Sequence, residues 1–154
     1  MKTRAYRIVK ARRAEGAFDG EGARLNGGRW NSKGTRMVYT AGSRALAGLE
    51  MLVHLTSSLL RMGYVVIEAE FDSRLAKAVR LEDLPKDWAA SQPTAATQAL
   101  GDSWARGATS PILAVPSAII HEELNYLFNP RHRDFARIRI GEPKPFAFDS
   151  RLLE

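Results

Sequence analysis

Cysteine is absent from the 154 residues of this chain, and so is any long apolar run. Without cysteine there can be no disulfide bond, thiolate metal ligand or cysteine nucleophile, and such a composition is typical of reducing compartments. No apolar stretch approaches the roughly 18–20 residues that cross a bilayer, and the basic segment 1–13 has no apolar core of the kind found in signal peptides. We therefore expect a cytoplasmic protein without a membrane partner.

Metal-ligand spacings and blocks of basic residues are missing as well. The histidines, His54, His121 and His132, form no pair with the spacing of a metal site, so we expect no bound metal. The chain carries 23 Lys and Arg against 17 Asp and Glu, a net charge of +6. No run of about five or six basic residues and no nucleic-acid-binding motif accompanies this charge. The charge alone leaves open a nucleic acid, an anionic small molecule, an acidic protein partner or an ordinary basic surface.

The residues that are present indicate one globular domain of the α+β class over residues 1–154. Hydrophobic residues make up 45% and charged residues 26% of the chain, as in ordinary soluble domains. From alternating and β-branched residues, strands are expected over 5–9, 36–41, 64–71, 112–115, 136–140 and 146–148. Between them we expect a glycine-rich loop over 18–33, a helix over 43–63 and short helices over 84–88 and 94–106. Because these strands are not spaced as regular βαβ units, they predict a mixed sheet flanked by helices.

The most unusual segment is Gly27-Gly28-Arg29-Trp30-Asn31. Two glycines let the backbone approach a ligand closely, and the arginine that follows can bind a phosphate or pyrophosphate through two parallel hydrogen bonds. The alternative is a turn whose arginine is solvated and whose tryptophan covers the core. Gly20-Glu21-Gly22 does not make a dinucleotide-binding loop, because the third glycine is missing and no helix is expected to follow.

The helix expected over 43–63 carries one carboxylate beside its apolar stripe. Ser43 is a good N-cap, and Leu46, Leu49, Val53 and Leu60 follow at helical spacing. Glu50 lies one step from this stripe, so it is either exposed or directed into a cleft. In a cleft it could stabilise a cationic, oxocarbenium-like transition state or hold a ribose hydroxyl. His54, one helical turn later, is expected on the same face.

Two segments near the C-terminal half could line the same site. Ser117 follows an apolar strand and a proline, where a serine can bind a ligand, act as a nucleophile or cap a turn. No Gly-x-Ser-x-Gly elbow surrounds it and no histidine is placed as its base, which argues against a serine hydrolase. Segment 125–130 mixes aromatic residues with amides, as in a packed turn or the wall of a pocket.

Taken together, these segments resemble the RES domain, the toxin component of bacterial RES–Xre toxin–antitoxin pairs. The resemblance extends over nearly the whole chain in family order. The matching pieces are Phe18-Asp19-Gly20 with Gly22-Ala23, Gly28-Arg29-Trp30-Asn31 with Gly34, Val38-Tyr39-Thr40-Ala41 with Ser43, Leu46-Ala47 with Leu49-Glu50, Leu84-Pro85 with Trp88, Thr97-Gln98 with Gly101 and Trp104, Val115-Pro116-Ser117, Asn125-Tyr126-Leu127 with Asn129-Pro130, and Phe148-Asp149 with Arg151.

This resemblance implies a single RES domain over residues 1–154, with a fold like the ADP-ribosyltransferase and diphtheria-toxin catalytic domains. It implies an enzyme that consumes NAD⁺ as its substrate and needs no further cofactor. It also implies neutralisation by an Xre-type antitoxin that covers the active site, so that nucleic acid is reached only through the antitoxin. The arginine, glutamate and serine of the family map to Arg29, Glu50 and Ser117, although Ser43 and Ser110 also lie near motifs.

The resemblance implies the following roles. Arg29 would bind the pyrophosphate, Tyr39 would stack on the nicotinamide or its ribose, and Glu50 would stabilise the charge that develops as the C1′–N bond breaks. Ser117 would orient the ligand, with substrate-binding neighbours at Gly28, Asn31, Ser43 and Asn129. Capture of the cation by water or phosphate would degrade NAD⁺, whereas capture by a protein side chain would be ADP-ribosylation. A non-catalytic, basic nucleic-acid-binding module is the third alternative.

Overall fold

Two alternating segments form the longest strands of the sheet, β1 (Lys2–Lys10) and β3 (Tyr64–Asp72). The computed structural model, which describes residues 1–153, pairs them antiparallel along their whole length, from Lys2 opposite Asp72 to Lys10 opposite Tyr64. Since successive side chains point to opposite faces, each strand buries apolar residues on both sides of the sheet. The strands expected over 5–9 and 64–71 are confirmed, and both extend slightly further.

The sheet of the described residues has eight strands in the order β4-β5-β6-β2-β1-β3-β7, with β8 paired to β3 off this path. β4 and β5 run parallel and the other pairs are antiparallel, so the sheet is mixed as expected. The remaining strands are β2 (Val38–Ala41), β4 (Ala76–Ala78), β5 (Ile112–Pro116), β6 (Leu124–Phe128), β7 (Arg139–Ile140) and β8 (Lys144–Phe146).

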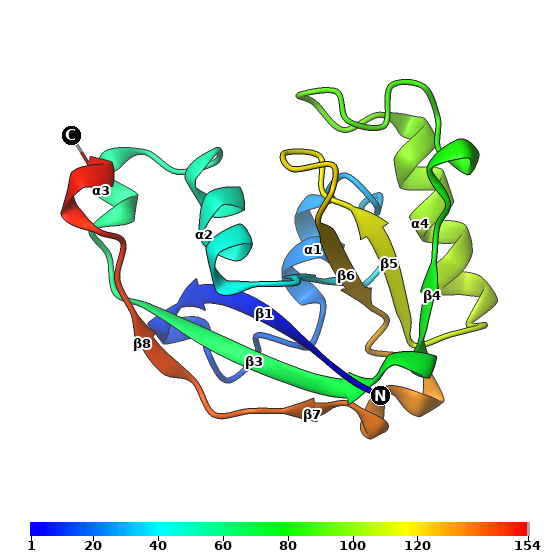
Figure 1. Cartoon of the computed structure of the whole chain (residues 1–154), viewed down its shortest axis with the longest axis horizontal. Coiled ribbons are helices and arrows are strands. Elements are labelled where there is room, and N and C mark those ends of the chain that lie inside the picture. The colour runs from blue at the N-terminus through cyan, green and yellow to red at the C-terminus, as the bar shows by residue number, and fades with distance from the viewer. Residues whose placement is uncertain (154) are drawn as a thin grey trace.

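Helices flank this sheet at two places (Figure 1). The α-helices are α1 (Glu21–Asn26), α2 (Arg44–Leu52), α3 (Ser57–Leu60) and α4 (Ala95–Gly107), and 3₁₀ turns cover Ala11–Arg13, Ser73–Leu75, Leu81–Asp83, Arg133–Arg137 and Ser150–Leu153. In Figure 1, α2 lies over β1, whereas α4 lies beside β4 and β5 at the other end of the sheet. Among residues 1–153, none of the helices combines the length and the apolar character needed to cross a bilayer.

The core is divided into three packed groups. The first is formed mainly by residues of the strands and contains Ala5, Val38, Ala69, Phe71, Leu75, Ile112, Phe128 and Ile138. A second is covered by α2 and contains Ile8, Ala41, Leu46, Ala47, Leu60, Tyr64, Val66 and Phe148. The third joins the glycine-rich segment to α4 and contains Trp30, Met37, Trp104, Leu113, Val115 and Leu127. The second and third groups anchor the two elements that carry the candidate site, α2 and the loop around Trp30.

The expectation of a long loop over 18–33 is wrong in part, because α1 occupies its middle. The backbone N–H of Glu21 donates to Asp19 Oδ1, and Glu21 forms an ion pair with Arg24 one turn later. Gly20, at φ +75°, provides the turn into the helix. A helix therefore does follow Gly20, contrary to the expectation, but its six residues are too few to give the periodic pattern on which sequence analysis depends.

The single helix expected over 43–63 is also wrong, because the chain forms α2 and α3 with a break between them. Ser43 does cap α2: its Oγ accepts the Leu46 N–H at 3.0 Å. Gly48 is buried facing Phe146 and Phe148, whereas Leu49 and Val53, both expected on the apolar stripe, are 37% and 59% exposed. The buried face of α2 is made by Leu46 and the small residues Ala47 and Gly48, and hydrophobic periodicity does not reveal the two small ones.

Elsewhere the expected elements are confirmed with shifted ends or replaced. β2 and β5 match the strands expected over 36–41 and 112–115, and α4 matches the helix over 94–106, with Thr94 as its N-cap. The helix expected over 84–88 is replaced by turns after a 3₁₀ turn at Leu81–Asp83. The strand expected over 136–140 shrinks to β7, and the one expected over 146–148 is displaced to β8, which shares only Phe146 with it. β6 is a strand where a packed turn or a pocket wall was expected.

Candidate active site

Glu50 is placed by the buried face of α2. It lies three and four residues after Ala47 and Leu46, both of which are buried against the sheet, so it continues the same face one turn further along. At Glu50 the helix meets the end of the β5–β6 hairpin. The carboxylate is therefore half-buried at the boundary between the core and solvent.

Two side chains from that hairpin hold the carboxylate. Glu50 Oε1 accepts from Asn125 Nδ2 at 2.8 Å and from Ser117 Oγ at 3.2 Å. The hairpin register explains the pairing: Val115 lies opposite Asn125, and the Ser117 N–H donates to the Glu123 carbonyl at 2.8 Å. We refer to Glu50, Ser117 and Asn125 as the carboxylate cluster.

The hydrogen bonds of Ser117 indicate that it positions Glu50 and does not act as a nucleophile. Its side chain is fully buried, its hydroxyl donates to Glu50, and its oxygen accepts the N–H groups of Ile119 and Ile120 at 3.1 and 3.2 Å. A hydroxyl has one donor and two acceptor positions, and all three are occupied here.

Burial raises the pKa of the Glu50 carboxyl above its ordinary value. The hydrogen bonds from Asn125 and Ser117 oppose this rise, as do the charges of His54 and Arg29, all of which lower the pKa. The cluster thus combines a desolvated carboxylate with donors that favour its charged form. Such a group can stabilise a positive charge that develops beside it.

Arg29 lies close enough to the cluster for its charge to act on Glu50 and on Tyr39. Its side chain is half-buried, and Nη1 donates to the Trp88 carbonyl at 3.0 Å. A carbonyl carries no full charge, so this contact leaves the guanidinium charge available to an anion. Arg29 therefore has the exposure and the free charge that an anion-binding residue needs.

Tyr39 holds the backbone around Arg29. Its hydroxyl accepts the Trp30 N–H at 3.0 Å and donates to Asn31 Oδ1 at 2.6 Å. A Cβ added to Gly28 would lie 2.7 Å from this hydroxyl, so the glycine is required by the tyrosine rather than by a ligand. Burial raises the pKa of Tyr39 well above its ordinary value, and the phenol therefore stays protonated and able to donate.

The structure brings Arg29, Tyr39, Glu50 and Ser117 to one region and places three other expected residues differently. Asn31 is fully buried, and its Nδ2 donates to three backbone carbonyls, so its amide is occupied within the fold. The Ser43 hydroxyl caps α2. Asn129 lies at the opposite end of the hairpin, where its N–H donates to Pro111 O and its Nδ2 to Ala105 O.

Asn125 is the residue that sequence analysis missed. Segment 125–130 contains two asparagines. The one assigned to substrate binding, Asn129, follows β6, whereas Asn125 is the second residue of that strand. Recognising 124–128 as a strand antiparallel to 112–116 would have placed Asn125 beside Ser117. The available signal was the β-branched content of 112–116 and the aromatic content of 124–128, which is weak for strands of five residues.

A solved structure shares this fold. A chain in the crystal structure of the M. tuberculosis MbcT–MbcA toxin–antitoxin complex superposes with a TM-score of 0.76, over 96% of this chain and 85% of that one. The two sequences are 19% identical. At that level the likeness establishes the fold, so the α+β class expected from the sequence is confirmed.

Sequence similarity extends to the family. The family model of the RES domain matches residues 4–149. Proteins called Toxin Res are 35% identical over 150 residues in Photorhabdus laumondii (97% of this chain, 96% of the relative) and 36% identical over 148 residues in Yersinia enterocolitica (96% and 97%). A Sphingobium protein called Prs ADP-ribosylating toxin is 35% identical over 158 residues (99% and 98%). The chain therefore belongs to the RES-domain family, as the resemblance predicted.

Proposed function

We propose that this protein is the toxin of a toxin–antitoxin system and that it cleaves the nicotinamide–ribose bond of NAD⁺. The carboxylate cluster carries the proposal. When the C1′–N bond breaks, nicotinamide leaves with the bonding electrons and the ribose becomes an oxocarbenium-like cation. Glu50, held by Ser117 and Asn125, has the charge and the half-buried setting to stabilise that cation, and fixed donors keep it in place without reorganisation.

Arg29 would bind the pyrophosphate of the same substrate. Its planar guanidinium can form two parallel hydrogen bonds to phosphate oxygens, and the Trp88 carbonyl contact orients it. The Tyr39 hydroxyl is engaged with the loop, so the part of Tyr39 left for a nicotinamide or ribose is its ring. Arg29 would then hold the pyrophosphate while Glu50 stabilises the charge on the nicotinamide ribose attached to it.

The acceptor decides between two activities. Water attacking C1′ and losing a proton would give ADP-ribose, and inorganic phosphate attacking the same carbon would give ADP-ribose phosphorylated at that carbon. A nucleophilic side chain of a target protein would give an ADP-ribosylated protein instead. The Sphingobium relative, called an ADP-ribosylating toxin, favours this second activity as the alternative.

Product analysis separates these possibilities. Purified protein is incubated with NAD⁺, with and without phosphate, and the nucleotides are resolved by chromatography, using the Glu50→Gln variant and, as a control, Glu122→Gln on an exposed loop. We expect loss of NAD⁺ with free nicotinamide in the parent and the control, and a rate lower by about 10²–10³ in Glu50→Gln. Stable NAD⁺ that is consumed only when a target protein is added would favour transfer. Degradation by Glu50→Gln at the parental rate would contradict the role of Glu50.

We further propose that an antitoxin protein covers this site. The net charge of +6 suits an acidic surface, and the structural neighbour was solved as a toxin–antitoxin complex. Co-expression with a cognate antitoxin should relieve growth arrest and prevent NAD⁺ loss. Growth arrest that persists while the two proteins form a stable complex would contradict coverage of the site.

A further inference from the structure

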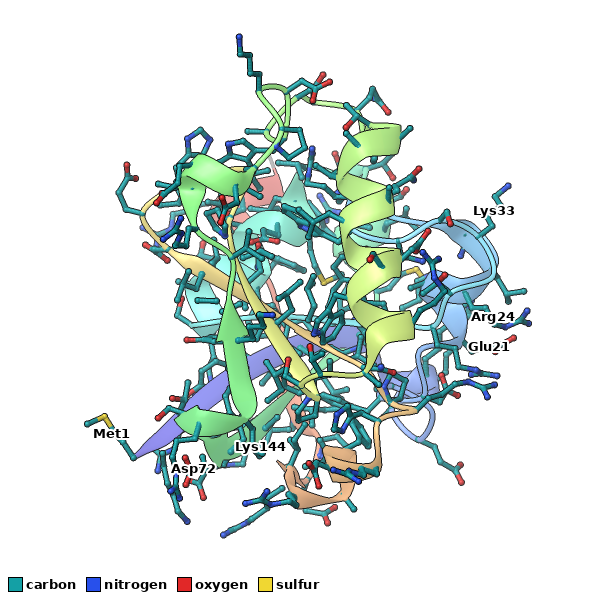
Figure 2. All side chains as sticks on the ribbon, turned by 90° about the vertical axis from the view of Figure 1, so that its right-hand side faces the viewer. Met1, Glu21, Arg24, Lys33, Asp72 and Lys144 are labelled. Carbon is teal, nitrogen blue, oxygen red and sulfur yellow. The ribbon has the colours of Figure 1, made fainter. Side chains whose placement is uncertain are left out.

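The segment 28–32, here called the arginine loop, is held by α4 at most of its residues. Gln98 Nε2 donates to the Gly28 carbonyl at 3.0 Å. The carboxylate of Asp102 accepts the Ser32 N–H at 3.0 Å through Oδ1, and its Oδ2 accepts the Ser32 hydroxyl. Figure 2 shows α4 in front of the sheet, with the chain segment that carries Lys33 beside it.

The backbones of α4 and the arginine loop are also in direct contact. A Cβ added to Gly101 would lie 1.6 Å from the Trp30 carbonyl oxygen, a distance that no side chain could tolerate. Gly101 and Asp102 follow Gln98 by three and four residues, so they lie on the same face of the helix as Gln98. One face of α4 therefore contacts Gly28, Trp30 and Ser32, the residues on both sides of Arg29.

Asp102 is the charged member of this face, and its burial requires an explanation. The side chain is only 8% exposed, and a buried carboxylate is costly unless its hydrogen bonds are well made. Both of its oxygens are used on Ser32, three residues after Arg29. The carboxylate of Asp102 therefore fixes the position of Ser32, and with it the end of the arginine loop, against α4.

We propose that Asp102, supported by Gln98, is a positioning residue that sets the place of the Arg29 guanidinium for the substrate pyrophosphate. This inference rests on the proposed function. Asp102 touches no substrate, and it acts only through the backbone of the arginine loop. Bidentate binding of a phosphate depends on the angle of the guanidinium plane, so a small rotation of the loop weakens binding without altering the carboxylate cluster on α2 and the hairpin.

The test compares Asp102→Ala, the conservative Asp102→Asn and a matched control, Thr97→Val. Thr97 is buried in the same helix, but its hydroxyl donates to Thr94 O and does not reach the arginine loop. We expect Asp102→Ala to raise KM for NAD⁺ about tenfold with kcat within about twofold of the parent, since only ligand binding loses an interaction. Asp102→Asn keeps a carbonyl oxygen for the Ser32 N–H, so its KM should rise much less above the parental value than that of Asp102→Ala. Thr97→Val should lower the melting temperature and leave KM unchanged.

A second readout does not depend on activity. The Nε–Hε resonance of Arg29, observed by NMR in the protein without NAD⁺, should shift in Asp102→Ala and stay in place in Thr97→Val. If the parent protein does not consume NAD⁺, the proposed function fails, and this resonance alone decides whether Asp102 positions Arg29. An unmoved Arg29 resonance, or an unchanged KM in Asp102→Ala, would overturn the inference.

Discussion

Asn125→Ala would remove the stronger of the two donors that hold Glu50. The Asn125 amide donates to Glu50 Oε1 at 2.8 Å and to the Thr40 carbonyl at 3.2 Å. A hydrogen bond to a charged group contributes about 1.5–3 kcal/mol, and one between neutral groups about 0.5–1.5 kcal/mol. We therefore expect the free energy of unfolding to fall by about 2–4 kcal/mol at neutral pH. For a chain of this length that corresponds to a melting temperature lower by about 5–15 °C.

The deficit should depend on pH. The Asn125 hydrogen bond lowers the pKa of Glu50, so its loss raises the folded-state pKa further above the unfolded value. A carboxyl whose folded pKa is raised contributes most to stability below its unfolded pKa, and this contribution is lost as pH rises through the folded pKa. The variant should therefore lose less stability at pH 4, where Glu50 is largely protonated in both proteins, than at pH 7.

Urea denaturation followed by circular dichroism at both pH values measures this difference. The matched control is Asn129→Ala, which removes another buried amide of the same hairpin, one that donates to a backbone carbonyl and not to a carboxylate. Its deficit should be the same at pH 4 and pH 7. Equal, pH-independent deficits in the two variants would refute the assignment of Asn125 to the Glu50 carboxylate.

Three further substitutions test other parts of the structure. Glu50→Gln should unfold at a higher urea concentration than the parent at pH 7 and at the same concentration at pH 4. The reason is that burial raises the pKa of Glu50, so ionisation of this carboxyl lowers the free energy of unfolding as pH rises through its folded pKa. No difference at pH 7 would contradict the desolvation of this carboxylate. Arg29→Lys keeps the charge but loses the planar fork, so KM for NAD⁺ should rise about tenfold in a steady-state assay, and an unchanged KM would exclude bidentate binding. Gly101→Ala should destabilise the protein by at least about 3 kcal/mol in thermal unfolding, because its Cβ would meet a backbone carbonyl oxygen at 1.6 Å. The control is Gly107→Ala, whose added Cβ would have no neighbouring atom within 4 Å, and it should not destabilise the protein.

Features that depend on residues near each other in the chain were predictable from the sequence. The alternation in 64–71 predicts β3, Ser43 and Thr94 predict the starts of α2 and α4, and the order of short motifs predicts the RES family. Each of these signals arises from local hydrogen bonding or from side-chain periodicity, which a single segment expresses without its neighbours.

The composition of the carboxylate cluster was decided only by the tertiary structure. Glu50 meets Ser117 and Asn125 across separations of 67 and 75 residues, and the register of β5 against β6 determines which asparagine arrives there. A strand shifted by one residue would turn Asn125 to the other face of the sheet. Sequence analysis could thus nominate Glu50 and Ser117, but the choice of Asn125 over Asn129 required the register, because it depends on distant strands packing together.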